Sequence, residues 1–530
     1  MRSVKVLDVT LRDGGCVNDF NFGQSYMEQI LSALEASDVE YIELGYIDQN
    51  KGTKKGRTQF CNELVITEYF LKSKKPNTTY VAMMDYGKFD VDLLKPCNGD
   101  GIDGIRMAFH KKNRYDMISL GRKIIEKGYK FFIQPMITLR YSDAELLELI
   151  ELVNRELPDA SGFYIVDSFG EMRANDMNRI MNLVDHNLLP SMLLGFHSHN
   201  NLQMSYSNAV ALLKFPTKRD IMIDCSILGM GKGAGNLNTE LLLEHLNLFY
   251  GKDYHLEPLL SVIDRVINQI RGEYNWGYAI EYYLSSINHC TPSYAGHFYN
   301  KHMLPIDQVA ELLSLIAEDK KISFDKEYAE KLYLEYNARK RADDTELVEY
   351  LKDSLKQKRV VLIAPGKSIL EANEKIVEEM KDADTVSIAL NNWELFNTDY
   401  VFITRQELLN TAIELDKQII TTTNISNASQ DNVHVIDYQK WVVLDNEVQD
   451  SSGILILNLL SNCDIAEVVL AGFDGFHVNF SKNYYDKAMN HPITAEQADK
   501  RNDSFAKYLR NLKQRIPVRF ITKSIYEEGL

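Results

Sequence analysis

The chain has 530 residues, of which 45% are hydrophobic and 25% are charged, and its formal net charge is −16. This length exceeds one ordinary core, so we expect two or more domains, and the composition excludes a largely disordered chain. The negative charge argues against nonspecific binding to nucleic acid or to an anionic membrane. No apolar run reaches the roughly 18 residues of a membrane span, and the six cysteines are scattered, which favours a cytoplasmic protein with free thiols.

Short apolar segments alternate with amphipathic stretches over the first half of the chain. Eight segments read as strands: 4–10, 41–45, 80–84, 105–109, 131–137, 163–166, 192–196 and 221–223. The stretches between them, such as 26–36 and 143–155, have apolar residues at helical spacing. Eight strands that alternate with helices predict an α/β fold of the (β/α)8 TIM-barrel type, whose active site lies at the carboxyl ends of its strands.

Polar side chains are found at the ends of these predicted strands, where a barrel places its active site. They are Arg12, Asp13, Glu43, Asp85, His110, Thr138, Arg140, Asp167, Ser168, His197 and His199. Because the carboxyl ends of barrel strands share one rim, we expect these side chains to converge.

His197 and His199 stand one residue apart at the end of an apolar run, so their imidazoles lie on the same face of a strand. Two imidazoles and a carboxylate suit a divalent cation, and Asp13 is the best oxygen donor in the chain. Two strand histidines with ordinary hydrogen bonds are the alternative. The charged pair Arg12 and Asp13 at a buried strand end favours the metal site.

A glycine-rich loop at 228–236 follows the eighth strand, and it can present N–H groups to an anion or let the backbone approach a metal. The region 256–336 is helical and rich in aromatic residues, which we expect to pack on the barrel or on a second subunit of a homodimer. A charged helical connector at 337–359 comes next. These features divide the chain into a barrel (1–255), a helical extension (256–336), the connector and a C-terminal domain (360–530).

The C-terminal domain has a second series of apolar strands, typical of an open Rossmann-like α/β sheet. The first begins at 360, and the others are at 385–389, 400–403, 419–422, 433–436, 468–470 and 518–521. The triplet Gly366, Lys367 and Ser368 follows the first of these strands. It is not a P-loop, because Val361 stands where that motif requires glycine. A shorter turn of this kind either binds a phosphate or is purely structural.

Four segments, TLRDG (10–14), IELG (42–45), GFHSHNNL (195–202) and GMGKGAGN (229–236), resemble in order the signatures of the DRE-TIM metallolyases, also called HMGL-like or pyruvate carboxyltransferase domains. That superfamily includes 4-hydroxy-2-oxovalerate aldolase, HMG-CoA lyase, 2-isopropylmalate synthase and homocitrate synthase. The resemblance covers about residues 4–300. The glycine loop and the segment 294–299 are most similar to the hydroxy-oxovalerate aldolase branch.

The resemblance implies roles for individual residues. The implied metal ligands are Asp13, His197, His199 and Asn236. The implied catalytic residues are Arg12, Cys16, Glu43 and Tyr294, and the implied substrate-binding residues are Arg12, Thr138 and Gly233. Arg12 would bind the carbonyl or enolate oxygen of a 2-oxo acid, and Tyr294 would take part in proton transfer. Mn2+ is the expected metal, and Mg2+ or Zn2+ also fit such a ligand set.

One position departs from the aldolase pattern, because Cys16 stands where that branch has a basic histidine. A thiol whose pKa is lowered by a metal and by Arg12 can act as a base or nucleophile, and otherwise it only packs. His110, Tyr294 or a metal-bound water are the alternative proton carriers. The glycine loop also lacks the catalytic cysteine of HMG-CoA lyase, which disfavours lyase activity of that kind.

The sequence therefore predicts a divalent-metal-dependent aldolase that makes or cleaves a carbon–carbon bond between a pyruvate-type 2-oxo acid and an aldehyde. A Claisen condensing acyltransferase that uses acetyl-CoA is the first alternative. The second is an inactive barrel that supports a C-terminal transferase or regulatory domain. Segments 363–370 and 470–476 are loosely similar to nucleotide-binding folds of bacterial sialyltransferases and pterin diphosphokinase-like proteins, so a nucleotide or sugar nucleotide is the expected C-terminal ligand.

Overall fold

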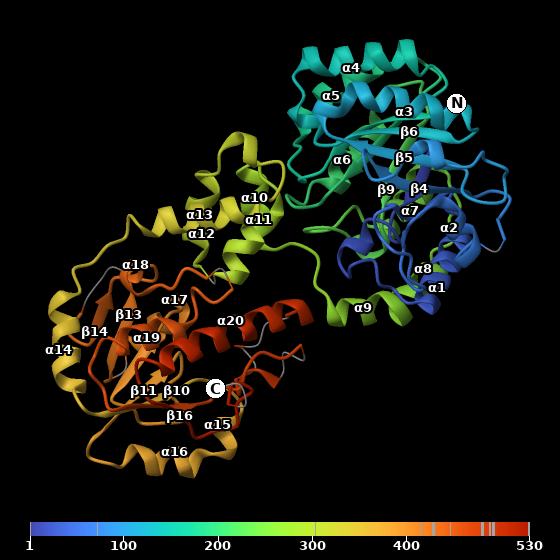
Figure 1. Cartoon of the computed structure of the whole chain (residues 1–530). Helices are drawn as coiled ribbons and strands as arrows, with labels where there is room; N and C mark the ends of the chain where they lie inside the picture. Colours follow the sequence, from blue (N-terminus) through green and yellow to red (C-terminus); the bar gives the residue numbers. More distant parts are fainter. Residues whose placement is uncertain are drawn as a thin grey trace. The chain divides into compact units, whose positions relative to one another are not determined.

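The computed structural model describes residues 2–71, 73–302, 304–414, 416–426, 430–445, 447–478, 482–486, 489 and 493–527. The chain folds as two compact units, Met1–Ala295 and Gly296–Leu530, and each is described here by itself (Figure 1). The finer division into a barrel, a helical extension, a connector and a C-terminal domain stays a prediction. No helix within the described ranges is long and apolar enough to cross a membrane.

Eight parallel strands form a closed barrel in the first unit, because β1 pairs with both β2 and β9. The barrel strands are β1 (Val4–Asp8), β2 (Tyr41–Ile47), β4 (Thr79–Asp85), β5 (Gly104–Phe109), β6 (Lys130–Pro135), β7 (Gly162–Asp167), β8 (Leu193–Ser198) and β9 (Ile221–Cys225). A short strand, β3 (Gln59–Phe60), pairs with the end of β2. The predicted (β/α)8 barrel is therefore confirmed.

Helices connect the strands and cover the outside of the barrel (Figure 1). They are α1 (Gln24–Ala36), α2 (Glu63–Tyr69), α3 (Arg114–Glu126), α4 (Asp143–Glu156), α5 (Ala174–Asn187), α6 (Ser205–Lys214) and α7 (Thr239–Tyr250). Helix α4 shows why such segments are helical. Ser142 and Glu145 form a capping box at its start, and Leu146, Leu149 and Val153 are buried along one face.

Alternation along the strands separates two apolar layers. One layer lies between strands and helices. The other fills the barrel interior and consists of Leu7, Val9, Tyr41, Val81, Phe132, Tyr164, Val166, Leu193 and Met222. Since side chains two residues apart share a face, Glu43, His197 and Asp224 point into the same interior as Tyr41, Leu193 and Met222. The polar side chains thus point into the barrel interior, and the apolar layer lies next to them toward the amino-terminal ends of the strands.

Two strands end earlier than predicted, and both differences shape the rim. The first strand was expected to reach Thr10, but β1 ends at Asp8, and the Val9 carbonyl then accepts hydrogen bonds from the amides of Arg12, Asp13 and Gly14. The fifth was expected to reach Ile137, but β6 ends at Pro135, and Ile137 has a left-handed φ of 55°. In both places a tight turn follows the shortened strand, because the chain must reverse its direction before the next helix.

The first unit continues through α8 (Glu257–Val262), a π-helical turn (Ile263–Ile267), α9 (Asn268–Glu273), α10 (Ile280–Ile287) and α11 (Pro292–Gly296). This segment lies on loops of the barrel. The indole of Trp276 donates to the Leu228 carbonyl over 2.9 Å, and the Ser286 hydroxyl donates to the Phe169 carbonyl over 2.6 Å. Trp276 and Ser286 therefore hold the extension on the barrel of the same chain, whereas Tyr274, Tyr278 and Tyr283 are exposed.

The second unit contains a parallel sheet of seven strands in the order β14-β13-β12-β11-β10-β15-β16. Its strands are β10 (Arg359–Ile363), β11 (Thr385–Leu390), β12 (Tyr400–Ile403), β13 (Gln418–Thr422), β14 (Val433–Ile436), β15 (Glu467–Ala471) and β16 (Val518–Phe520). The described helices of the unit are α12 (Ile306–Ser314), α13 (Lys326–Asn337), α14 (Thr345–Leu355), α15 (Ser368–Glu371), α16 (Asn373–Met380), α17 (Gln406–Ala412), α18 (Tyr438–Trp441), α19 (Ser452–Leu460) and α20 (Ala495–Lys513).

The strand order reverses between β10 and β15, so two predicted motifs that are about 100 residues apart become neighbours. The amide of Gly366 donates to the Gly472 carbonyl over 3.2 Å. A side chain at Gly366 would clash with that carbonyl, its Cβ lying 2.2 Å from the oxygen, which explains the glycine. The charged stretch before the sheet is a shorter helix than predicted, because α14 ends at Leu355 and Arg359 already belongs to β10.

Candidate functional site

Asp13, His197 and His199 come together at the carboxyl ends of β1 and β8. One ligand atom from each of the three side chains lies within 4.8 Å of the others, and all three residues are buried. Nδ1 of His199 is 3.9 Å from Oδ2 of Asp13, and the two imidazole rings are nearly perpendicular, with centroids 5.4 Å apart. The structure thus brings together three of the four predicted ligands in one group suited to a metal ion.

Asn236, the fourth predicted ligand, lies beside this group. Its amide nitrogen donates to Oδ2 of Asp13 over 2.7 Å and to the Met230 carbonyl over 3.1 Å. The glycine loop can approach because Gly231 has no side chain, since a Cβ there would lie 2.7 Å from Oδ2 of Asp13. The loop therefore closes over the Asp13 carboxylate.

The protonation states of the group suit a cation. Burial lowers the pKa of His199 to about 4, although the Asp13 carboxylate opposes this, so the imidazole is neutral and its lone pair is available. Burial alone would raise the pKa of Asp13, but Arg12 and the two histidines hold it below its usual range. The site therefore combines neutral imidazole with an ionised carboxylate.

Several buried polar atoms in this region make no hydrogen bond within the part of the chain that the structure describes. They include Nδ1 of His199, Oδ1 of Asn236 and one terminal nitrogen, NH2, of Arg12. A lone pair, a carbonyl-type oxygen and an N–H donor without partners are costly in a folded protein unless a ligand satisfies them. These atoms fit a site that holds a cation next to an oxygen-bearing substrate.

Arg12 is held in place from two sides. Its Nε donates to Oε2 of Glu43 over 2.6 Å, and its NH1 donates to Oδ1 of Asp13 over 2.8 Å. Burial would lower the pKa of Arg12, but Glu43 and Asp13 outweigh it and raise the pKa above its usual value. The guanidinium is therefore permanently charged, and two of its nitrogens are fixed while the third remains available.

The barrel interior contains a second ion-pair group that the sequence analysis missed. Arg106 of β5 is completely buried, lies 3.0 Å from Oε2 of Glu43 and contacts Oδ2 of Asp224 in β9. The same Asp224 oxygen is 2.9 Å from Nδ1 of His197. A carboxylate on Nδ1 fixes the ring and leaves Nε2 for a metal. The available signal was a charged residue inside each buried strand, Ile105-Arg106-Met107 and Ile223-Asp224-Cys225.

Charge balance across the site also favours a cation. Two guanidinium groups, those of Arg12 and Arg106, face three carboxylates, those of Asp13, Glu43 and Asp224. Burial raises the pKa of Asp224 by itself, but Arg106 and then His197 lower it below its usual range, so the carboxylate is ionised. These carboxylates and guanidinium groups together leave one excess negative charge, which a bound cation would compensate.

Cys16 follows Asp13 in the turn Gly14–Cys16 and is exposed. Loss of hydration at the sulfur and then the Asp13 carboxylate raise the pKa of its thiol above the usual value. The condition for a thiolate base or nucleophile, a lowered pKa, is thus not met by the protein groups around it. Cys16 carries a neutral thiol that keeps its proton near neutral pH.

The remaining predicted residues lie in the following places. The hydroxyl of Thr138 donates to the Pro135 carbonyl over 2.9 Å and accepts from the Val166 amide over 2.8 Å, which joins β6 to β7. Gly233 has a φ of 68°, and a side chain there would meet the Asn201 amide oxygen at 2.9 Å. Tyr294 is completely buried in α11. Substrate binding by Thr138 and Gly233 and proton transfer by Tyr294 stay predictions.

Asp85 and His110 end neighbouring strands of the rim. Burial raises the pKa of Asp85, with a hydrogen bond from Tyr46 opposing it. Burial lowers the pKa of His110, although Asp85 opposes this, so the imidazole is neutral near neutral pH. Asp167, by contrast, accepts hydrogen bonds from the amides of Glu171 and Met172, and it shapes the loop after β7.

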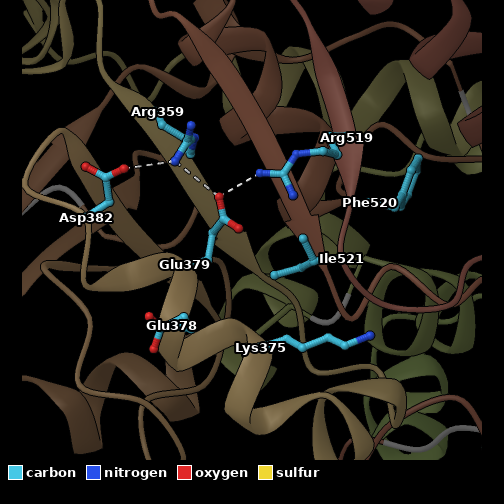
Figure 2. Close-up of a pocket in the computed structure, with 8 residues that line it drawn as sticks. All are labelled: Arg359, Lys375, Glu378, Glu379, Asp382, Arg519, Phe520 and Ile521. Atoms are coloured by element: carbon cyan, nitrogen blue, oxygen red, sulfur yellow. Dashed lines mark hydrogen bonds and ion pairs between the residues drawn. The ribbon is translucent and has the colours of Figure 1, made fainter.

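The second unit has two places that the sequence or the shape suggests for a ligand. At the turn after β10, the Ser368 amide and hydroxyl both donate to the Asp474 carboxylate, the amide over 2.9 Å. A hollow of about 490 Å³ lies elsewhere, next to the first residue of β10 (Figure 2). Its Arg359 and Arg519 are already paired with carboxylates, Glu379 being 3.3 and 2.6 Å from them. We assign no ligand to this hollow.

Comparison with known proteins gives concordant results for the barrel. Residues 3–256 match the family model described as HMGL-like. The chain is 28% identical over 247 residues to 4-hydroxy-2-oxovalerate aldolase 2 of Comamonas testosteroni, which covers 46% of this chain and 68% of that protein. It is 27% identical over 278 residues to 4-hydroxy-2-oxovalerate aldolase of Moorella thermoacetica, covering 51% and 78% of the two chains.

Among solved structures, the N-terminal domain of a proposed aldolase from Bacteroides vulgatus is similar at 25% sequence identity with a TM-score of 0.48. The similarity covers 59% of this chain and 97% of that domain. The family model and the curated relatives match the part of the chain that forms the barrel and carries all four predicted signatures. Residues 3–256 are therefore an HMGL-like domain of the DRE-TIM superfamily.

Proposed function

We propose that the barrel is a divalent-metal-dependent aldolase that makes or cleaves a carbon–carbon bond at the enolate of a pyruvate-type 2-oxo acid. The observation that carries this proposal is the group of Asp13, His197 and His199 next to a buried Arg12 nitrogen without a partner. Relatives named 4-hydroxy-2-oxovalerate aldolase support the same class of reaction.

The residues that would hold the metal are Asp13, His197 and His199, with Oδ1 of Asn236 as a fourth donor. When bound, a divalent cation supplies Lewis-acid polarisation of the carbonyl and carboxylate oxygens of a 2-oxo acid. The excess negative charge of the buried group and the unpartnered imidazole nitrogen support this assignment. Mn2+, Mg2+ and Zn2+ all suit the donor set, and Mn2+ remains the metal we expect.

Arg12 would stabilise the oxygen that becomes negative as the enolate forms. Its third nitrogen is buried and can donate a hydrogen bond to that oxygen without further reorganisation. Glu43 and Asp13 hold the other two nitrogens, so the donor is oriented before the substrate binds. Glu43 would therefore act as a positioning residue in the barrel interior, because it contacts both arginines.

Proton transfer requires a group that is neutral and basic near neutral pH. His110 suits this task, because burial lowers its pKa and the free imidazole can accept a proton. Cys16, with a raised pKa, suits the opposite task of holding and donating a proton. We therefore favour His110 as the proton acceptor, with Cys16 and Tyr294 as candidate donors.

The proposal is tested by incubating the purified full chain with a racemic 4-hydroxy-2-oxo acid and a divalent metal, and by measuring pyruvate release. We expect release that EDTA abolishes and that His199→Ala lacks. A Claisen acyltransferase would instead act only with acetyl-CoA and a 2-oxo acid, and it would release free coenzyme A. Coenzyme A release without aldol cleavage would replace our proposal by that alternative. An inactive scaffold would show neither reaction despite bound metal.

For the second unit we propose a nucleotide or sugar nucleotide as ligand, at the point where the strand order reverses. Parallel sheets bind ligands at such points, outside the carboxyl ends of the strands. The turns at Gly366 and Gly472 meet there, and Ser368 and Asp474 offer a hydroxyl and a carboxylate. Calorimetric titration with CMP, UDP and ATP tests this, and Asp474→Ala should change the affinity. Absence of binding by all three nucleotides would contradict it.

A further inference from the structure

A second cluster of histidine and carboxylate side chains lies within the unit Gly296–Leu530. We propose that His297, His302 and Glu330 bind a divalent transition-metal ion, and that Zn2+ is the ion whose preferences fit best. One ligand atom from each side chain lies within 4.8 Å of the other two. This cluster shares no residue with the barrel group and comes from a different part of the chain.

Local structure brings the two histidines together. His297 begins a π-helical turn, His297–Lys301, and His302 follows it directly. The two histidines are five positions apart in the chain, which is about one turn of a π-helix, so both imidazoles lie on the same side of it. Their ring centroids are 5.2 Å apart, and the rings are tilted by 79°. Glu330 reaches the same point from α13, where it is buried. A helical turn and a separate helix therefore supply the ligands, as in many small metal sites.

His302 is oriented as a metal ligand would be. Its Nδ1 hydrogen-bonds to Oδ2 of Asp450, and Oδ1 of Asp450 accepts from the hydroxyls of Tyr333 and Tyr438 over 3.0 and 2.6 Å. A carboxylate on Nδ1 directs the lone pair of Nε2 away from it, toward the cluster. The His302 ring also stacks on Tyr333 at 3.9 Å, so its direction is fixed.

The Nε2 atom of His302 is the observation that points to a ligand. The His302 side chain is completely buried, and among the residues described Nε2 makes no hydrogen bond. The nearest carboxylate oxygen, Oε2 of Glu330, is 3.3 Å away without the geometry of a hydrogen bond. This nitrogen therefore faces the Glu330 carboxylate as an ion-pair partner, and a cation bound by both groups would replace that ion pair.

Glu330 is held by several groups that suit a buried anion. Oε2 accepts from the Gln449 amide over 2.6 Å, and Oε1 lies 2.8 Å from Nε2 of His297 and also contacts the ammonium of Lys301. The Lys301 ammonium thus supplies positive charge where a metal ion would supply it. Since the Lys301 side chain is 17% exposed, it can turn toward solvent when a cation displaces it.

The donor set identifies the class of cation. Two imidazoles and one carboxylate leave the fourth position of a tetrahedron for water, an arrangement that Zn2+ favours, with Zn–N distances of about 2.0–2.1 Å. Ca2+ and Mg2+ prefer all-oxygen sites and are disfavoured here. The ligands come from the turn at His297 and from α13, and the groups that hold them are Gln449 and Asp450. A bound ion would therefore connect these three segments.

The test counts metal ions in the full chain. Protein stripped with a chelator is dialysed against Zn2+ and washed, and bound zinc is measured by atomic emission. We expect two equivalents in the wild type and one in His297→Ala, Glu330→Gln and the barrel variant His199→Ala. The double variant His199→Ala/His297→Ala should bind none. His434→Ala is the matched control, since His434 lies on β14 of the same unit and bonds to Gln418, and it should keep two equivalents.

A readout in the folded state covers the chance that an alanine variant fails to fold. In the His199→Ala chain, Co2+ should give the intense visible absorption of a tetrahedral site, and Lys301→Met should tighten Co2+ binding about tenfold by removing the competing ammonium. Three results would overturn the proposal. They are a single equivalent of zinc in the wild type that His199→Ala removes, a second equivalent that persists in His297→Ala, or Co2+ binding that Lys301→Met leaves unchanged.

Discussion

Nδ1 of His197 and Oδ2 of Asp224 are 2.9 Å apart, and the same carboxylate oxygen contacts Arg106. This relationship links a predicted metal ligand to a buried ion pair in the barrel interior. Replacing a carboxylate that holds a ligating histidine typically weakens metal binding or activity by about 10- to 100-fold. Asp224 is thus placed to fix both the tautomer and the direction of the His197 ring.

Asp224→Asn should weaken divalent-metal binding by about 10- to 100-fold, because an amide cannot match the carboxylate on Nδ1 of His197. Isothermal titration of the chelator-treated full chain measures the affinity, and circular dichroism confirms folding. Asp92→Asn is the control, since the Asp92 carboxylate forms an exposed ion pair with Lys123, outside the barrel interior. Equal affinities in both variants would mean that Asp224 does not orient His197.

Arg12→Lys should lower the rate of enolate formation by about 10²- to 10³-fold while the metal content stays near one equivalent at the barrel. Lysine keeps the positive charge but has a single nitrogen. It therefore cannot contact Glu43 and Asp13 as the guanidinium does and also offer a third donor to the substrate. The rate is measured by pyruvate exchange and the metal by atomic emission. Arg122→Lys, an exposed position on α3, serves as control. A full rate in Arg12→Lys would remove the guanidinium from the reaction.

Alkylation of Cys16 should be slow near neutral pH and should accelerate as the pH rises toward 12. A raised pKa lowers the thiolate fraction of Cys16 near neutral pH, and the thiolate is the reactive form. Iodoacetamide labelling of the metal-free chain, followed by peptide mass spectrometry, measures the rate. Cys16 should react more slowly than glutathione under the same conditions, although the residue is exposed. Rapid labelling of Cys16 at pH 7 would restore it as a candidate base.

Arg106→Met should destabilise the barrel by about 3–5 kcal/mol, because it leaves Glu43 and Asp224 with one cationic partner fewer in a buried site. Urea unfolding is followed by the fluorescence of Trp276 in a chain whose other tryptophans, Trp393 and Trp441, are replaced by phenylalanine. Arg122→Met, which removes a surface ion pair, should cost no more than about 1 kcal/mol. Similar losses in the two variants would show that the interior pair is not specially stabilising.

Most of the fold could be predicted from the sequence, because its strands are short apolar runs separated by clearly amphipathic helices. All eight barrel strands and all seven strands of the second sheet coincide with predicted segments. The wrong predictions lie at strand ends. After β1, the Val9 carbonyl accepts hydrogen bonds from three backbone amides, and after β6, Ile137 has a left-handed conformation. Such turns depend on local backbone geometry that apolar periodicity does not report.

The site was predictable where its residues are adjacent in sequence, as with the two histidines and the Arg12–Asp13 pair. Arg106 and Asp224 were missed because their partners are supplied by other strands across the barrel, 118 residues apart. The same reason explains why the sequence did not predict the cluster of His297, His302 and Glu330, whose members come from a π-helical turn and from α13. Only the packing of these elements makes their side chains neighbours.

The account rests on enolate formation at the barrel group, and proton exchange at the methyl group of pyruvate tests it most directly. Pyruvate in D2O is incubated with the full chain and Mn2+, and deuterium incorporation is followed by mass spectrometry. We predict exchange that requires both the metal and the protein, that EDTA stops and that His199→Ala lacks. Pyruvate that stays unlabelled while metal analysis shows an occupied barrel group would contradict the account.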